Sequence, residues 1–577
     1  MRLSNALAAT ALLLTMSGTI FQAQRPTPAQ SPSPAPATNL PTLKVSTRLV
    51  VVDVVAADGK GHPITDLKAE DFSLLEEGSN QSIKVFSFQQ PAPADQPQQT
   101  PATLPPNLVT NVPTYKPNRA LNVLLLDGLN TENTAQKYAR QEMLKYLAKL
   151  PTGQPVAVYL LGNRLRLLQD FTTDPKLLQQ ALEKIKDKNS ALLKSDPALS
   201  AAAAASLTEM GLQSMVAQIQ SFQQEEVAGQ LDLRVETTVS ALMSLARTLA
   251  GYPGRKNLIW ISSSFPSNLI DLAGLNSGDV RRQASATSQG RAYSDQIERL
   301  SSALSNARVA VYPVDTKGVY NVGPLTQLAS HDDPGGAPTE DPQSIHETMN
   351  TFAERTGGRA FYNTNDLTSS IREGIEDGST YYTLGYYPEN KDWNGKFRKI
   401  IVKANRPGVK LHYRQGYVAS DPHAYQKLNA KQQAMDFGQA LNLDNPIATA
   451  LPFKSALILP SERTANKLVV NFGIDAHALS FELQDDGLQH TSVDCAVQVF
   501  NNKGTAIRPV QAQNFSAALK PEQYQLVMQK FFPCNQALAL DPGDYLLRLG
   551  VRDNTTGLVG TVNAPVTIAA AAQTAKP

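Results

Sequence analysis

The segment from residue 119 to 420 alternates short apolar runs with helical patterns, and this alternation constrains the fold more than any other feature. The runs are LNVLLLD (121–127), VAVYLL (156–161), NLIWIS (257–262) and VAVYPVD (309–315). Runs this apolar are typical of parallel strands that are buried on both faces. The segment therefore predicts an α/β domain with a doubly wound, mostly parallel sheet of the Rossmann-like type.

Two Pro-rich segments, 25–42 and 91–118, predict linkers, because they contain few residues that can form a core. They bracket residues 43–90, where β-branched runs and Gly-containing turns predict a small β unit. A unit of this size buries little core by itself. We therefore expect it to pack on the next domain.

The α/β segment contains an Ala- and Gln-rich stretch at about 188–232, which predicts a helical insertion. Near its end, aromatic and β-branched residues at 380–418 predict a hairpin on the edge of the α/β sheet. Residues 421–449 predict a helical connector, and 450–568 carry strand candidates at the spacing of a β-sandwich. The last residues, 569–577, predict a disordered tail.

The first 24 residues have the layout of a secretory signal peptide. Arg2 precedes an apolar run over 6–16, and small residues follow at 17, 18 and 23. The run is too short to span a bilayer. The sequence therefore predicts an exported protein that is periplasmic, cell-surface or secreted, with no transmembrane segment after cleavage at about residue 24.

Charge and motifs argue against several function classes. The 53 basic and 51 acidic side chains give a net charge of +2, which provides no field for nucleic acid. No phosphate-binding Gly-rich loop or His-Glu-x-x-His pattern is present. Ser262, Ser263 and Ser264 follow a strand without a Gly-x-Ser-x-Gly elbow. His346 lies at a polar helix start, which predicts a solvated side chain.

Specific sequence segments carry a resemblance to a known family. They are GHPITDLKAEDFSLLEEG (61–78), DGLNT (127–131), PGRKNLIWISSSFP (253–266), FAERTGGRAFYNTNDL (352–367) and YYTLGYYP (381–388). In this order they resemble the von Willebrand factor type A (VWA)-related proteins that are common in acidobacteria. The resemblance covers about residues 45–420 and implies a type A-like α/β domain.

The resemblance also implies a metal-ion-dependent adhesion site, in which hydroxyls and carboxylates at strand ends hold Mg²⁺. Asp127, Thr131 and Thr238 match positions of that motif. Leu129, however, stands where the family has a Ser, and no carboxylate stands at 262–264. Mg²⁺ needs oxygen ligands and charge. We therefore expect a degenerate site with no cofactor or only weak Mg²⁺ binding, where Asp127 caps a helix or braces a loop.

The function implied by the resemblance is non-catalytic binding of a protein or cell-envelope partner through the strand-end loops. Asn130 and the serines 262–264 are the candidate ligand-binding residues. Two alternatives stay open: a structural scaffold or assembly factor with no strand-end ligand, and a hydrolase that uses the serines.

Cys495 and Cys534 are the only cysteines of the chain. An exported protein meets an oxidising compartment, which favours a disulfide between them. Two separate buried thiols are the alternative, because sequence does not show that the sulfurs meet.

Export is testable on protein purified from the native host. N-terminal sequencing should begin between about residues 19 and 30, within the usual length of a signal peptide. The cytoplasmically expressed chain, which keeps Met1, serves as the control. Recovery of the intact N-terminus from the host's soluble cytoplasm would contradict the prediction.

Overall fold

The computed structural model describes the following residues: 48–90, 104–113, 120–151, 153–185, 201–265, 287–319, 342–421, 423–443, 445–464 and 466–569. The predicted signal peptide (1–24) and first linker (25–42) lie outside them, as do part of the predicted insertion and nearly all of the predicted tail. Within the described residues, no helix combines the length and the apolar character needed to cross a membrane.

The α/β domain is built on one sheet with the strand order β10-β9-β6-β7-β8. Its strands are β6 (Leu121–Asp127), β7 (Val156–Leu161), β8 (Leu165–Thr172), β9 (Lys256–Ser262) and β10 (Val309–Asp315). All pairings are parallel except that of β7 with β8. Strands β7 and β8 are added on one side of β6, and β9 and β10 are added on the other side. The strand β6 therefore lies at the topological switch point of a doubly wound sheet.

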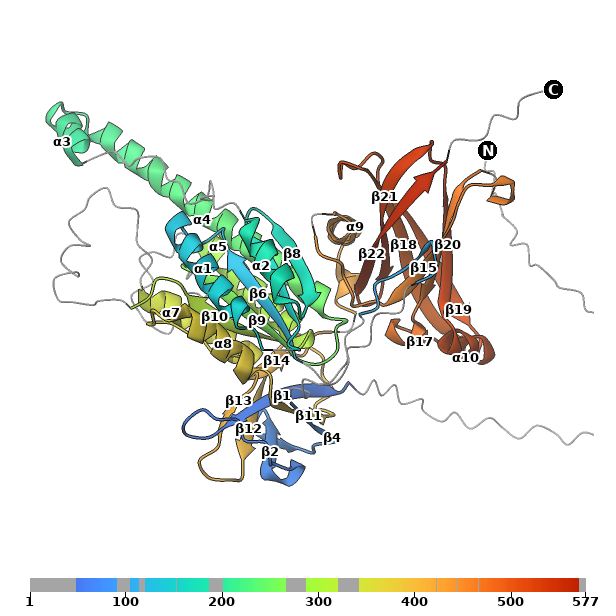
Figure 1. Ribbon diagram of the computed structural model, residues 1–577, viewed down its shortest axis with the longest axis horizontal. Helices are drawn as coiled ribbons and strands as arrows, with labels where there is room; N and C mark the ends of the chain where they lie inside the picture. Colours follow the sequence, from blue (N-terminus) through green and yellow to red (C-terminus); the bar gives the residue numbers. More distant parts are fainter. Residues whose placement is uncertain are drawn as a thin grey trace, which may run out of the picture. The chain divides into compact units, whose positions relative to one another are not determined.

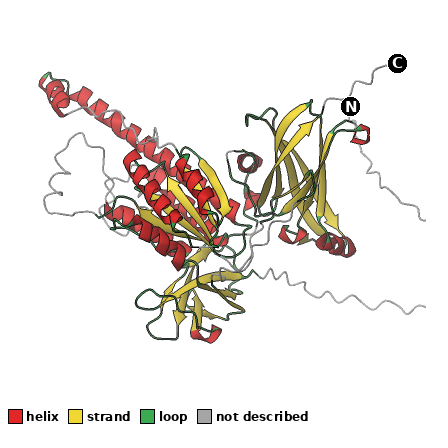
Figure 2. Ribbon diagram, in the orientation of Figure 1, coloured by secondary structure: helices red, strands yellow, loops and turns green. Residues whose placement is uncertain are grey.

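Helices cover both faces of this sheet (Figures 1 and 2). They are α1 (Asn133–Ala148), α2 (Pro175–Glu183), α4 (Gln213–Leu249), α5 (Thr287–Asn306), α7 (Pro342–Thr356) and α8 (Leu367–Asp377). The alternation of side chains along β6 separates two cores. Val123 and Leu125 join the core of α4, α5 and α7, whereas Leu124 and Leu126 join that of α1, α2 and α8.

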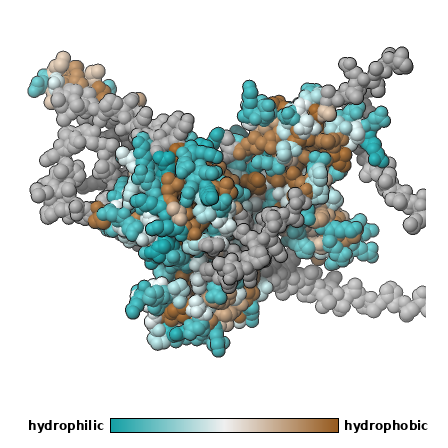
Figure 3. Space-filling model, viewed as in Figure 1, coloured by the Kyte–Doolittle hydropathy of each residue, from teal (hydrophilic) through white to brown (hydrophobic). Residues whose placement is uncertain are grey.

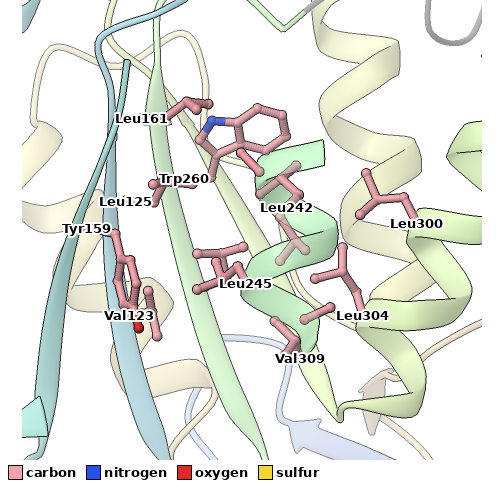
Figure 4. Packing of buried hydrophobic residues seen from close by; sticks show 14 of the residues in the cluster. Val123, Leu125, Tyr159, Leu161, Leu242, Leu245, Trp260, Leu300, Leu304 and Val309 are labelled. Atoms are coloured by element: carbon pink, nitrogen blue, oxygen red, sulfur yellow. The ribbon is translucent and has the colours of Figure 1, made fainter. Parts of the chain in front are cut away.

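Figure 4 shows the first of these cores, where Trp260 of β9 lies among leucines of α4 and α5. The Trp260 side chain is fully buried. Its ring centroid lies 4.7 Å from that of Phe265 and 5.7 Å from that of Phe352, both in edge-on contacts. The sequence interpretation of Trp260 as a core residue is confirmed.

The described part of the predicted insertion, from residue 201, is largely helical, as expected. Helix α3 (Ala201–Glu209) precedes α4, and α4 runs without interruption from the predicted insertion into the domain core. The α4 sequence contains no Pro, so nothing in it ends the helix earlier. Where α3 meets α4, Met210 and Met215 are exposed apolar side chains, and this end of the helix pair shows hydrophobic colour in Figure 3.

The small β unit is built from two distant parts of the chain. One sheet has the order β13-β1-β11-β4 and the other β14-β12-β2-β3. The first part supplies β1 (Val50–Ala57), β2 (Phe72–Glu76), β3 (Ser79–Gln81) and β4 (Val85–Gln89). The second supplies β11 (Tyr381–Tyr386), β12 (Phe397–Ala404), β13 (Lys410–His412) and β14 (Gly416–Val418).

The predicted place of residues 380–418 on the edge of the α/β sheet is therefore wrong. Strand β11 pairs with β1, and β12 pairs with β2, both antiparallel. The physical reason is the size of the N-terminal segment. Its own strands cannot complete two layers, and the strands that follow the α/β domain supply the missing half of a common core.

The C-terminal region contains two further sheets that share one core. The first, β20-β16-β15-β5, contains β5 (Leu108–Thr110), β15 (Phe453–Ile458), β16 (Leu468–Ile474) and β20 (Phe532–Leu538). The second contains β17 (Glu482–Leu483), β18 (Gln489–Asn501), β19 (Gln511–Leu519), β21 (Gly543–Asp553) and β22 (Val559–Ile568).

Two boundaries of this region differ from the sequence prediction. Strand β5 falls in the predicted linker 91–118, yet it pairs with β15 at the edge of the first sheet. Its Leu-Val-Thr run is short and stands among prolines, so the sequence pattern did not predict a strand there. In the predicted connector 421–449, the α-helix α9 covers only Ala430–Ala440.

The structure joins Cys495 of β18 to Cys534 of β20 in a disulfide that links the two C-terminal sheets. A cross-link over a sequence separation of 39 residues lowers the entropy of the unfolded chain. On the chain-entropy model, reduction should lower the free energy of unfolding by about 3–4 kcal/mol.

Thiol labelling of the unreduced, denatured protein should accordingly find no free thiol, and the reduced protein should show both. Denaturant unfolding with and without reductant measures the loss of stability. Two free thiols before reduction would overturn the pairing.

Candidate functional site

The candidate site lies at the carboxyl ends of three neighbouring strands. Asp127 ends β6, Ser262 ends β9 and Asp315 ends β10, and Asp315 is the register partner of Ser262. In open α/β sheets this edge, beside the switch point, is where ligands bind. The structure brings together all the strand-end residues that the sequence singled out, and the hydrogen bonds below connect them.

The Asp127 carboxylate is the centre of the site. Its Oδ1 accepts hydrogen bonds from the backbone N–H of Leu129, at 3.1 Å, and of Asn130, at 2.9 Å. These bonds hold the turn that leaves β6. Asp127 therefore braces the loop between β6 and α1, which is one of the two roles that the sequence favoured.

The second carboxylate oxygen of Asp127 reaches across to β9. Oδ2 accepts from Trp260 Nε1 at 3.0 Å, from Ser262 Oγ at 3.1 Å and from Asn130 Nδ2 at 2.9 Å. With the two backbone bonds, the carboxylate has five donors. Two carboxylate oxygens offer about four lone-pair positions, so no acceptor capacity is left for a cation.

An arginine of α4 completes this arrangement. Arg234 Nε donates to Asn130 Oδ1 at 3.0 Å. Asn130 Nδ2 also donates to Thr238 Oγ1 at 3.0 Å, and Thr238 Oγ1 donates to the backbone oxygen of Arg234 at 2.8 Å. Asn130 thus connects the Asp127 carboxylate to the Arg234 guanidinium.

Thr131 and the serines tie the loops after β6 and β9 to each other. Ser263 N donates to Thr131 Oγ1 at 3.0 Å, and Ser263 Oγ donates to Asn130 O at 3.2 Å. Gln136 of α1 supports the same turn, because its Nε2 donates to the backbone oxygens of Thr131 and Gly128. The turn after β6 and Ser263, directly after β9, are therefore joined by hydrogen bonds.

The sequence-derived site residues are all buried: Asp127, Asn130, Thr131, Thr238, Ser262, Ser263 and Ser264. The most exposed of them, Ser264, shows 7% of its surface. Their polar atoms are used on one another and on the backbone. In this arrangement the side chains organise the turns that follow β6 and β9.

Burial acts on the charge of Asp127. Desolvation raises the pKa of its carboxyl above the ordinary value, against the opposing effect of the hydrogen bonds from Asn130, Trp260 and Ser262. A raised carboxyl pKa in the folded state means that stability is fully present below the unfolded pKa and is lost as the pH rises through the folded pKa. At a pH above the folded pKa, the ionised Asp127 carboxylate therefore lowers the free energy of unfolding.

The residues do not fit the Mg²⁺ ion that the type A resemblance implies. Leu129 is a buried core residue without an oxygen, and the Asp127 oxygens already have five donors. Arg234 supplies positive charge at the same site. Within the part of the chain that the structure describes, no group of three or more His, Cys, Asp or Glu side chains could hold a metal ion.

Sequence reasoning missed Arg234 and Gln136 as site residues, and it gave Trp260 no polar role. A signal was present for two of them. Arg234 lies one helical turn before Thr238, and Trp260 lies two positions before Ser262 on the same strand face. Such spacing places side chains together, but it does not reveal a hydrogen bond.

The expectation for His346 is wrong. Its side chain is 15% exposed, and its Nε2 lies 3.8 Å from Oδ2 of the buried Asp315. The imidazole also stacks on Tyr362, with the ring centroids 4.1 Å apart. Helix α7 packs against β10, which brings His346 to the end of that strand.

Some solved structures are similar to this chain, at low sequence identity. No family model matches the chain, and no curated protein matches it. An aerotolerance-related membrane protein from Bacteroides fragilis is 14% identical over 44% of this chain and 98% of its own, with a TM-score of 0.21. The SpRpn10 VWA domain is 9% identical over 45% of this chain and 98% of its own, with a TM-score of 0.21.

A von Willebrand factor type A protein from Catenulispora acidiphila is also similar, at 9% identity over 56% of this chain and 73% of its own, with a TM-score of 0.22. Scores this low support no conclusion about function. The strand order, with β6 in the centre and Asp127 at its carboxyl end, is that of a doubly wound α/β sheet.

Replacing Asp127 tests the role of the carboxylate. Asp127→Ala leaves the indole N–H of Trp260, an amide N–H of Asn130 and the backbone N–H of Leu129 without their acceptor. Each unsatisfied buried donor costs about 1–3 kcal/mol, so the free energy of unfolding should fall by about 3 kcal/mol or more. This exceeds the roughly 0.5–2 kcal/mol of a simple cap.

Denaturant unfolding measures this change, and Trp fluorescence should report the altered surroundings of Trp260. Asp174→Ala is the matched control, because Asp174 caps α2 through a single exposed hydrogen bond. A loss no larger than that of the control would show that the buried hydrogen bonds of Asp127 contribute little.

Metal binding is tested by titrating Mg²⁺ or Mn²⁺ into the purified protein in a calorimeter. Since Mg²⁺ needs open oxygen ligands and gives up its water reluctantly, we expect no saturable site tighter than about 100 µM. Arg234→Gln is the informative comparison, because it removes the positive charge beside Asn130 and Asp127. A tight site in the wild type that Asp127→Ala abolishes would contradict the prediction.

Proposed function

We propose that this chain is an exported, non-catalytic binding protein whose type A-like domain recognises a protein or cell-envelope partner without a metal ion. The observation that carries the proposal is the hydrogen-bonded network of Asp127, Asn130 and Arg234. It occupies the place of an adhesion metal and connects the strand-end loops to β9 and α4. Residues directly after β6 and β9 that hydrogen bonds already hold in place lose little entropy on binding, which favours affinity.

The exposed side chains at this edge of the sheet supply the recognition surface. Glu132 follows β6, Asn163 follows β7, and Lys317 and Val319 follow β10. Val319 is an apolar side chain that is 54% exposed. Charged and apolar groups around a rigid centre suit a protein partner, because such surfaces combine a buried apolar contact with a polar rim.

A scaffold that binds through its C-terminal sheets is the second candidate. Strand β19 pairs with β18 and has mostly exposed side chains. Strands of this kind offer backbone groups to an added strand. A partner that docks there would leave the strand-end loops free.

A hydrolase is the third candidate, and the surroundings of Ser262 disfavour it. Ser262 is fully buried, and its Oγ lies 3.1 Å from Asp127 and 2.8 Å from the backbone oxygen of Ser264. Among the residues described, no histidine forms a hydrogen bond with it, so a base that could activate this hydroxyl is not in place.

Site-specific photo-cross-linking in the native host separates the first two candidates. A photoreactive residue at Val319 should capture a partner, because this position is exposed at the strand-end edge. The same residue at Lys149 is the matched control, since Lys149 follows the carboxyl end of α1 at the opposite end of the sheet. A third position, Gln513 on β19, reports the scaffold.

Capture at Val319 but not at Lys149 or Gln513 supports recognition through the loops. Capture at Gln513 alone favours the scaffold. The charge reversal Lys317→Glu should reduce the yield of cross-linked partner at Val319. An unchanged cross-linking yield in this variant, together with equal capture at Lys149, would reject a specific strand-end surface.

A further inference from the structure

A small cavity lies where the β unit meets the α/β domain, away from the strand-end site. It measures about 20 Å³ and is lined by Asp53 of β1, Arg414 and residues of the α/β domain that include Arg255, Arg308 and Thr356. A cavity needs roughly 10–15 Å³ on this scale to hold one water molecule. There is therefore room for one small guest.

The charges around the cavity do not balance. Asp53 is the only carboxylate that lines it, whereas three guanidinium groups do so. Asp53 is fully engaged, because Arg308 donates to both of its oxygens and Thr383 donates to Oδ1. Arg255 donates to Tyr312, which in turn donates to Asp377 outside the cavity.

Arg414 has no such partner. Its side chain is 9% exposed, and its Nε is a buried donor without an acceptor. Among the described residues its guanidinium forms no hydrogen bond, and its contact is with the ring of Tyr417, at 5.8 Å from the centroid. A buried, charged donor without an acceptor costs several kcal/mol in stability. An anion or a water molecule beside Arg414 would supply the acceptor.

We propose that a chloride ion occupies this cavity, hydrogen-bonded by Arg414 and held by the positive charge of Arg308 and Arg255. Chloride is a monoatomic acceptor that fits a cavity of one or two water volumes. Tetrahedral anions such as sulfate, with five heavy atoms, are too large for it. The ion would neutralise the excess charge and connect the β unit to the α/β domain.

Burial also acts on the pKa values of the cationic groups near the cavity. Burial lowers the pKa of Arg414 below its ordinary value, which the attraction of Tyr386 and Asp53 only partly offsets. Desolvation also lowers the pKa of Lys256, to about 7, and Arg308 acts in the same direction. A bound anion opposes both effects, since it stabilises charged neighbours.

Thermal unfolding of the full chain tests the proposal. The melting temperature is measured in sodium chloride and in sodium gluconate at equal ionic strength, so that general screening is the same in both. Above its Kd, chloride should raise the melting temperature by about 2 °C or more for each tenfold increase in concentration, because the ligand binds only the folded state. Sodium sulfate at the same ionic strength should not reproduce this rise.

Arg414→Gln should abolish the difference between chloride and gluconate. Arg406→Gln is the matched control, because Arg406 lies in the same β unit but forms an exposed ion pair with Asp66. Arg406→Gln should keep the full difference. Should Arg414→Gln fail to fold, Arg414→Lys, which keeps the charge but loses the planar guanidinium, should weaken the chloride response.

Chlorine-35 NMR of the wild type gives a readout that does not depend on unfolding. Binding should broaden the chloride line, and bromide should reverse the broadening by competition. Equal melting temperatures in chloride and gluconate, together with an unbroadened line, would show that water alone fills the cavity and would overturn the proposal.

Discussion

The burial of β6 on both faces is the constraint on which the rest of the α/β domain depends. Val123 and Leu125 need apolar partners on one side, and Leu124 and Leu126 need them on the other. Only helices on both faces of a parallel sheet meet this need, and they force the chain to cross over between strands. The carboxyl end of β6 then lies at the switch point, so the placement of Asp127 follows from the burial of its own strand.

The same physics explains why the strand-end site is closed. A carboxylate inside a protein must have donors, and Asp127 takes them from the indole of Trp260, from Ser262 and from the loop after β6. Arg234 adds a cation through Asn130. A divalent metal is thus unnecessary for charge compensation. The β unit shows the opposite case, because the Nε of the buried Arg414 has no acceptor among the residues that the structure describes.

Much of this organisation was predictable. The apolar runs predicted the sheet of the α/β domain, and the resemblance to the type A adhesion motif placed Asp127, Thr131 and Ser262 in one site. The partners Arg234 and Gln136 were missed, because each lies on a helix whose orientation depends on packing. The pairing of β1 with β11 was also missed, since antiparallel partners so far apart in sequence leave no local pattern.

The sequence by itself determined the alternation of strands and helices and the residues that face the two cores, because hydrophobic periodicity is a local property of the chain. It also determined that the strand-end motif lacks ligand oxygens at Leu129. Only the tertiary structure decided that Asp127 meets Trp260, that β5 joins a C-terminal sheet, and that the Nε of Arg414 is buried without an acceptor among the described residues. These contacts join segments far apart in the chain, and their geometry depends on how whole layers pack.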